Sequence, residues 1–220
     1  MQCSFKSFSL ISLFFVAFTG LFISCSQVTP EIYTTDYSVI FDYRDEEALP
    51  SARLSVFASS ASDVRRYERI SIKSLDSGYI WDTRKIERLD TYDLQWVGCT
   101  NLIVPEEEKL PSGKYEVTYY NADEKECTVT LDVKYDIELY DVLLSELSEF
   151  MKKKHGIQKI AVYDKEHIMI YFGDRTEEFK TTRGIWNAYR EAATYQVIWY
   201  AGNGSVICVE PEKTVTPNEE

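Results

Sequence analysis

The stretch KYEVTYYNADEKECTVTLDV, residues 114–133, consists of two runs of alternating apolar and polar residues around a polar turn. Successive side chains of a strand point to opposite faces, so each run predicts a strand with one buried and one solvated face. The stretch therefore predicts a β-hairpin in an antiparallel sheet that packs against a second layer. The expected inward positions are Tyr115, Val117, Tyr119, Cys127, Val129, Leu131 and Val133.

The same alternation continues toward the N-terminus as far as residue 36. Short alternating runs are broken by turn residues such as Asp76-Ser77-Gly78, and no helical periodicity interrupts them. About seven short strands in about a hundred residues predict an immunoglobulin-like or fibronectin-III-like β-sandwich. We place this domain at residues 36–135.

From Asp136 onward the pattern predicts a small α+β domain, residues 136–210. Apolar residues at helical spacing predict a helix from about residue 137 to 155, and a second helix is expected at about 182–193, capped by Thr181 or Thr182. Between and after the helices, four apolar runs predict a four-stranded antiparallel sheet, with Gly202-Asn203-Gly204 as one hairpin turn. The polar residues 211–220 predict a disordered tail.

Residues 1–24 have the pattern of an export signal. Lys6 precedes an uncharged apolar run, residues 7–24, and Cys25 follows directly. Leu21-Phe22-Ile23-Ser24 resembles a lipobox, the motif before a cysteine that becomes lipidated and then forms the new N-terminus. A standard lipobox has Leu three residues before the cysteine, where this chain has Phe22.

The lipobox resemblance implies a lipid anchor on Cys25, followed by a tether, residues 25–35. The anchor would hold the chain on the bacterial cell membrane or outer membrane, facing the periplasm or the cell surface. Several acyl chains give stable attachment, whereas one chain binds only marginally. The alternative is an uncleaved signal-anchor helix, because about 18 apolar residues can just span a bilayer.

A second resemblance lies inside the sandwich region. Trp96-Val-Gly98-Cys-Thr-Asn-Leu102, followed by Leu110-Pro-Ser-Gly113-Lys-Tyr115, resembles a segment of uncharacterised spirochaete lipoproteins. The relaxed lipobox is similar to theirs as well. The resemblance implies a location in the cell envelope and no known activity, and it transfers no catalytic residue.

Charge and composition narrow the range of partners. The formal charge is −12, and removal of the signal takes only Lys6 away, which leaves 23 − 36 = −13. Such an acidic chain is not expected to bind nucleic acid or to be drawn to anionic lipid by a polybasic patch. Hydrophobic residues make up 45%, which is typical of a globular protein.

The sequence predicts no enzyme, no cofactor and no metal site. The familiar zinc and serine-nucleophile motifs are missing, and the histidines His155 and His167 fall at a helix end and in a hairpin turn. Three cysteines remain after the signal and the anchor are set aside. They predict buried free thiols, with one disulfide as the alternative. These cysteines are Cys99, Cys127 and Cys208.

The leading hypothesis is a non-catalytic, membrane-tethered envelope lipoprotein that makes protein or envelope-polymer contacts. Sixteen tyrosines and four tryptophans suggest an alternative, a glycan- or solute-binding lipoprotein, with Tyr79, Tyr120 and Trp186 as the residues that would contact the ligand. A third possibility is an envelope hydrolase that uses carboxylates between Asp164 and Glu178.

Overall fold

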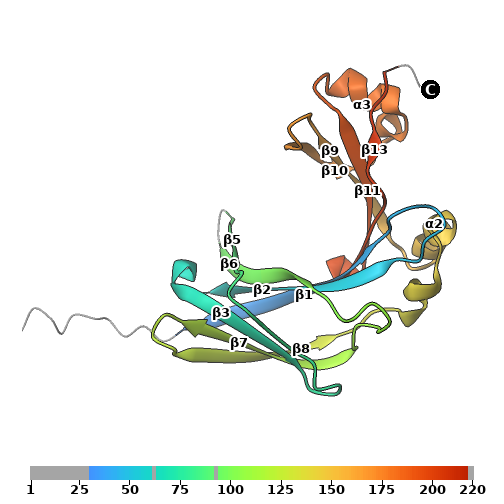
Figure 1. Ribbon diagram of the computed structural model, residues 1–220. Helices are drawn as coiled ribbons and strands as arrows, with labels where there is room; N and C mark the ends of the chain where they lie inside the picture. Colours follow the sequence, from blue (N-terminus) through green and yellow to red (C-terminus); the bar gives the residue numbers. More distant parts are fainter. Residues whose placement is uncertain (1–29, 61–62, 92–93, 218–220) are drawn as a thin grey trace, which may run out of the picture.

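The structure is a computed structural model that describes residues 30–60, 63–91 and 94–217, and it is mainly β (Figure 1). Its strands form two sheets. They are β1 (Ile32–Asp42), β2 (Ser51–Ser60), β3 (Tyr67–Ser74), β4 (Ile80–Thr83), β5 (Glu87–Asp90), β6 (Gln95–Leu102), β7 (Gly113–Asn121), β8 (Glu126–Val133), β9 (Ile157–Tyr163), β10 (Met169–Asp174), β11 (Thr194–Ala201), β12 (Val206–Val209) and β13 (Lys213–Thr214). Two α-helices lie among the described residues, α2 (Leu144–Lys153) and α3 (Thr182–Ala188).

The first eight strands form the predicted β-sandwich. One layer has the order β1-β2-β6-β5, and the other has the order β4-β3-β7-β8. The predicted hairpin is formed by β7 and β8, with Val117 opposite Val129 and Tyr119 opposite Cys127. Val117 and Tyr119 are fully buried between the layers, which confirms the inward face that the alternation predicted.

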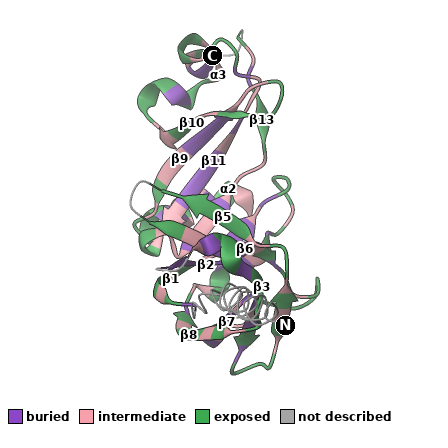
Figure 2. Ribbon diagram, turned by 90° about the vertical axis from the view of Figure 1, so that its left-hand side faces the viewer, coloured by how far each residue is buried: buried purple, intermediate pink, exposed green. Residues whose placement is uncertain are grey.

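The four-stranded antiparallel sheet that was predicted for residues 136–210 is also present. Its order is β10-β9-β11-β12, and β12 pairs in parallel with β1, from Val39 opposite Val206 to Asp42 opposite Val209. The C-terminal strands therefore continue the first layer of the sandwich. Figure 1 shows β9, β10 and β11 rising away from the sandwich, and Figure 2 shows buried residues in the middle of β9 and β11.

The helix predicted at 137–155 is broken in two. A 3-10 turn, Ile137–Asp141, is followed by Val142 and Leu143 in extended conformation before α2 begins. The break lets the two halves pack on different surfaces. Tyr140 contacts the ring of Phe41 in the sandwich at 5.2 Å, whereas Met151 of α2 lies 4.0 Å from the Cys208 sulfur of β12.

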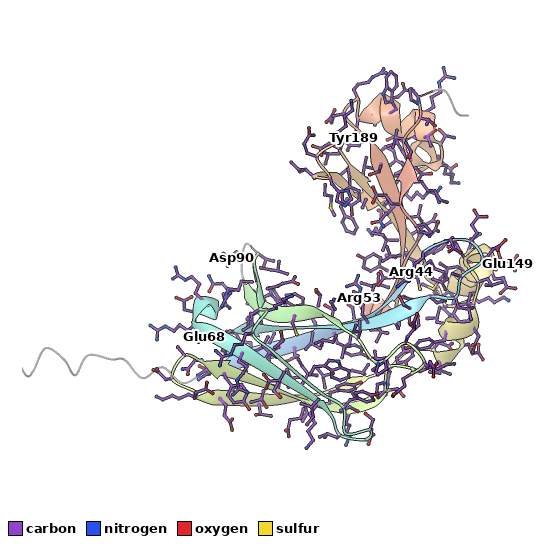
Figure 3. All side chains as sticks on the ribbon, in the orientation of Figure 1. Arg44, Arg53, Glu68, Asp90, Glu149 and Tyr189 are labelled. Carbon is purple, nitrogen blue, oxygen red and sulfur yellow. The ribbon has the colours of Figure 1, made fainter. Side chains whose placement is uncertain are left out.

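The helix predicted at 182–193 is shorter, because α3 ends at Ala188. Tyr189 is extended, and its ring packs on Tyr171 at a centroid distance of 5.3 Å, near the far end of the molecule (Figure 3). The predicted cap is confirmed, since Thr181 Oγ1 accepts a hydrogen bond from the Gly184 N–H at 3.1 Å. A Cβ on Gly184 would stand 1.7 Å from a backbone oxygen, so only glycine fits there.

Both predicted ends of the folded region are corrected. The tether at 25–35 is shorter than expected, because β1 already begins at Ile32. The tail at 211–220 is not disordered as far as it is described, because Lys213–Thr214 pairs with β11 and Val215 is 7% exposed. Val215, an apolar residue in an otherwise polar stretch, anchors residues 213–215 on the fold.

The predicted signal peptide and Cys25 lie outside the described residues. Within residues 30–217, apart from the gaps at 61–62 and 92–93, no helix is long and apolar enough to cross a bilayer.

Candidate binding pocket

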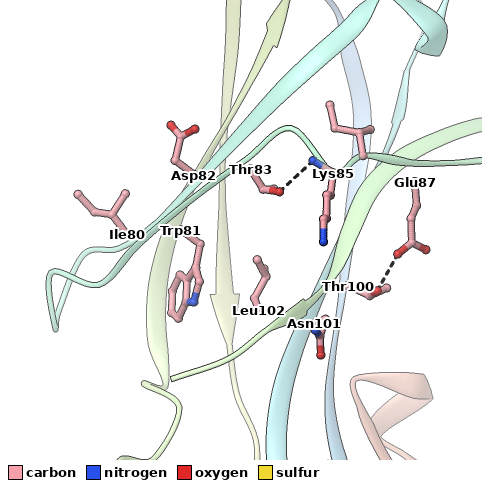
Figure 4. Close-up of a pocket in the computed structure, with 10 residues that line it drawn as sticks. Ile80, Trp81, Asp82, Thr83, Lys85, Glu87, Thr100, Asn101 and Leu102 are labelled. Carbon is pink, nitrogen blue, oxygen red and sulfur yellow. Dashed lines mark hydrogen bonds between the residues drawn. The ribbon is translucent and has the colours of Figure 1, made fainter. Parts of the chain in front are cut away.

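A pocket of about 790 Å³ opens on the side of the sandwich where both layers end (Figure 4). One wall is β4, the edge strand of the four-stranded layer. The other wall is the end of β6, where β5 no longer covers it because the pairing begins at Glu87 opposite Gly98. The lining residues are Ile80, Trp81, Asp82, Thr83, Lys85, Ile86, Glu87, Thr100, Asn101 and Leu102.

Trp81 forms a fixed part of this wall. It lies opposite Ile72 of β3, a fully buried residue, so its side chain points between the layers. The indole N–H donates a hydrogen bond to the Ile103 carbonyl at 2.7 Å, which ties β4 to the segment after β6. The ring also stacks on Tyr79 at 5.6 Å and on Tyr115 at 6.2 Å. Trp81 therefore shapes the pocket, but its ring is already stacked on other aromatic rings and its indole N–H is already hydrogen-bonded.

The charged residues of the lining differ in whether they have a partner. Asp82 forms an ion pair with Arg69 at 2.9 Å, and Glu87 accepts a hydrogen bond from the Thr100 hydroxyl at 2.7 Å. Lys85 extends into the space between β4 and β6 (Figure 4), and its ammonium makes no ion pair with a carboxylate of the described chain. The pocket thus presents a lysine ammonium that has no ion-pair partner in the described chain.

Comparisons of the chain with protein-family models, with curated proteins and with solved structures found no match. The residues that line the pocket are therefore what indicates its ligand.

The three aromatic residues predicted to contact a ligand do not come together. Tyr79 lies beside the pocket, where its ring stacks on Trp81 and its hydroxyl donates to Glu108. Tyr120 is on β7 and Trp186 is on α3, at opposite ends of the molecule (Figure 1). An arginine covers each of these two rings at 3.6 Å, Arg69 over Tyr120 and Arg190 over Trp186. They share no binding platform.

Sequence reasoning missed the residues that line the pocket. Asn101 is the one lining residue whose type fits its local conformation. Its φ of 65° is left-handed, and asparagine tolerates this conformation better than most residues. Lys85 and Ile86 belong to the connection between two four-residue strands, β4 and β5, which are too short to show clear alternation. Their place in a pocket follows from the packing of the layers.

The two histidines lie where the sequence placed them. His155 is exposed directly after α2, and His167 is exposed in the turn between β9 and β10. The ring of His167 stacks on Tyr163 at 4.7 Å. Among the residues that the structure describes, no three His, Cys, Asp or Glu side chains are grouped as metal ligands would be.

The predicted free thiols are observed. Cys99 and Cys208 are buried, Cys127 is half-buried, and none of them is in a disulfide. Burial raises the pKa of the Cys99 and Cys208 thiols to about 12, and the nearby carboxylates of Glu87 and Asp42 add to this. At neutral pH both groups are therefore protonated and poorly nucleophilic.

Two carboxylates of the hydrolase hypothesis, Asp164 and Asp174, have structural partners. Asp164 accepts hydrogen bonds from the backbone N–H groups of Glu166 and Ile168 in the β9–β10 turn. Asp174 pairs with Lys159 at 2.5 Å. These contacts stabilise a turn and a strand edge.

Proposed function

We propose that the chain is a non-catalytic, lipid-anchored lipoprotein of a bacterial cell envelope that contacts another envelope protein through the pocket between β4 and β6. The observation that carries the contact is the pocket itself, whose volume of about 790 Å³ lies within the range of ligand sites. Support for the anchor comes from Lys6, the apolar run and Cys25 in the order of a lipoprotein signal.

The arrangement of polar groups favours binding over catalysis. Carboxylate catalysis needs one group that is poised to give a proton and another that is free to act as base or nucleophile. In the pocket, Asp82 is held by Arg69 and Glu87 by Thr100. The buried thiols of Cys99 and Cys208 are kept protonated. The two carboxylates and the two thiols are therefore suited to stabilise the structure around the pocket.

We also propose that the sandwich is of the immunoglobulin type. The orders β1-β2-β6-β5 and β4-β3-β7-β8 correspond to strands A-B-E-D and C′-C-F-G of such folds. Further support comes from Tyr115 near the start of β7, whose hydroxyl donates to the Pro111 carbonyl four residues upstream at 2.6 Å. Immunoglobulin-like domains carry a tyrosine with this contact at the corresponding strand.

The short tether would keep the sandwich near the membrane. Residues 26–31 separate Cys25 from β1. Six extended residues reach about 20 Å. Partners of the pocket would therefore be envelope components that come within a short distance of the lipid surface.

The anchor predicts a clear effect of Cys25→Ala. In a host that processes lipoproteins, the intact chain is expected to incorporate labelled palmitate and to sediment with membranes, because several acyl chains hold a protein stably on a bilayer. The Cys25→Ala chain is expected to take up no label. The measurement is radiolabel and blot intensity in membrane and soluble fractions.

Cys127→Ala serves as the matched control, since Cys127 is a half-buried thiol far along the chain and should not affect labelling. The signal-anchor alternative would be supported by two results together. The wild type would take up no label, and the Cys25→Ala chain would stay membrane-bound at its uncleaved size. Digestion of intact cells with a non-permeant protease would distinguish a surface location from a periplasmic one.

A further inference from the structure

We propose that the pocket binds an extended peptide segment of another protein, which adds a strand along β4 and places an acidic side chain on Lys85. The inference rests on the proposed function and specifies the kind of partner that the pocket accepts.

β4 has an open edge. All four residues of β4 line the pocket, and in the described chain β4 pairs with β3 alone, from Ile70 opposite Thr83 to Lys73 opposite Ile80. The backbone groups on its outer edge are free to pair with another chain. Addition of a strand to such an edge is a common way to bind peptides, with backbone hydrogen bonds supplying much of the affinity.

The walls of the pocket leave room for a strand and for its side chains. The facing wall, residues 100–102 of β6, extends past the start of β5, so its edge away from β2 has no strand beside it in the described chain. Ile80 is 60% exposed at the rim, and Ile86 and Leu102 add apolar surface inside. An added strand would bury these groups against its own apolar side chains, as cross-strand pairs do.

The charges of the lining also bear on the partner. Asp82 is paired with Arg69 and Glu87 is bonded to the Thr100 hydroxyl, whereas the Lys85 ammonium has no carboxylate of the described chain within ion-pair distance as a counter-charge. An acidic side chain on the incoming strand would supply it. Such complementarity selects among partners more than it adds raw affinity.

The aromatic rings favour a peptide over a sugar. A sugar needs a flat ring with a free face, as well as free donors. Trp81, the aromatic residue of the lining, is stacked on Tyr79 and Tyr115, and its N–H is bonded to Ile103. The unpaired strand edge and Lys85 remain available, and both suit an extended acidic peptide.

The test uses the full chain, purified in detergent, on an array of randomised heptapeptides. The expected result is enrichment of Asp or Glu at one position and depletion of proline, because proline cannot donate to a strand ladder. Lys85→Glu is expected to weaken binding of the acidic peptides about tenfold and to shift the preference to Lys or Arg. Lys165→Glu, the same charge change in the exposed β9–β10 turn, should leave the motif unchanged.

A blank array, or the same acidic motif with Lys85→Glu, would overturn the inference. So would peptides that still bind when their central backbone nitrogens are methylated, or selective binding to a glycan array instead. If Lys85→Glu affects folding, Lys85→Met takes its place in the test. Circular dichroism first checks that this variant has the native fold. The anchor is decided separately by Cys25→Ala, so palmitate labelling with a blank peptide array would reject the peptide and keep the lipoprotein.

Discussion

Phe41→Ala is expected to lower the free energy of unfolding by about 3–5 kcal/mol and to destabilise both halves of the chain together. Phe41 is fully buried on β1. It lies between Ala52 of β2 and Cys208 of β12, so it belongs at once to the sandwich and to the C-terminal strands. Alanine would leave a cavity at this shared point, next to the ring of Tyr140 at 5.2 Å.

Urea unfolding followed through single tryptophans measures the effect in each half. Trp81 and Trp96 report on the sandwich, and Trp186 and Trp199 report on the C-terminal unit. Because the strands share one sheet, we expect coincident transitions that shift together in Phe41→Ala.

Phe172→Ala is the matched control, since Phe172 is the same residue type on β10 but is 47% exposed. Its expected cost is under about 1 kcal/mol. If Phe41→Ala moved the sandwich transition and left the C-terminal one in place, the two halves would be independent folding units.

The elements that sequence predicts well are those with local signals. The β7–β8 hairpin follows from two alternating runs, and the β11–β12 hairpin follows from the turn at Gly202-Asn203-Gly204. The pairing of β1 with β12 has no local signal, because Val206–Val209 has the same pattern at an edge as in the middle of a sheet. The break in the helix before α2 is likewise decided by the two surfaces that its parts bury.

The residues in and around the candidate site also divide into those with a local signal in the sequence and those whose place depends on strand pairing. Arg190 covers Trp186, a residue close to it in the chain, whereas Arg69 reaches Tyr120 only through the pairing of β3 with β7. The pocket depends on where β5 ends beside β6, which is a property of the sheet. That Lys85 lacks a partner is likewise visible only in three dimensions.

Raising the pH from 8 to 11 is expected to lower the free energy of unfolding by about 5 kcal/mol through two thiols alone, because burial raises the pKa of Cys99 and Cys208 from 9.0 to about 12. Both groups keep their protons in the native state and lose them near pH 9 in the unfolded chain. Their contribution is thus fully present below pH 9 and is lost as the pH rises through about 12. Burial raises the pKa of Tyr115 to about 12 as well, which steepens the loss above pH 10.

The measurement is urea unfolding at pH steps from 8 to 11, followed by far-ultraviolet circular dichroism. A double variant, Cys99→Ala with Cys208→Ala, is the control, and its stability should fall less steeply between pH 9.5 and 11 by about 2.4 kcal/mol per pH unit. Equal slopes in the wild type and the double variant would show that the two thiols are not held protonated by the fold. In that case only the burial of Cys99 and Cys208, at 3% and 0% exposed, would keep them from reacting in the native chain.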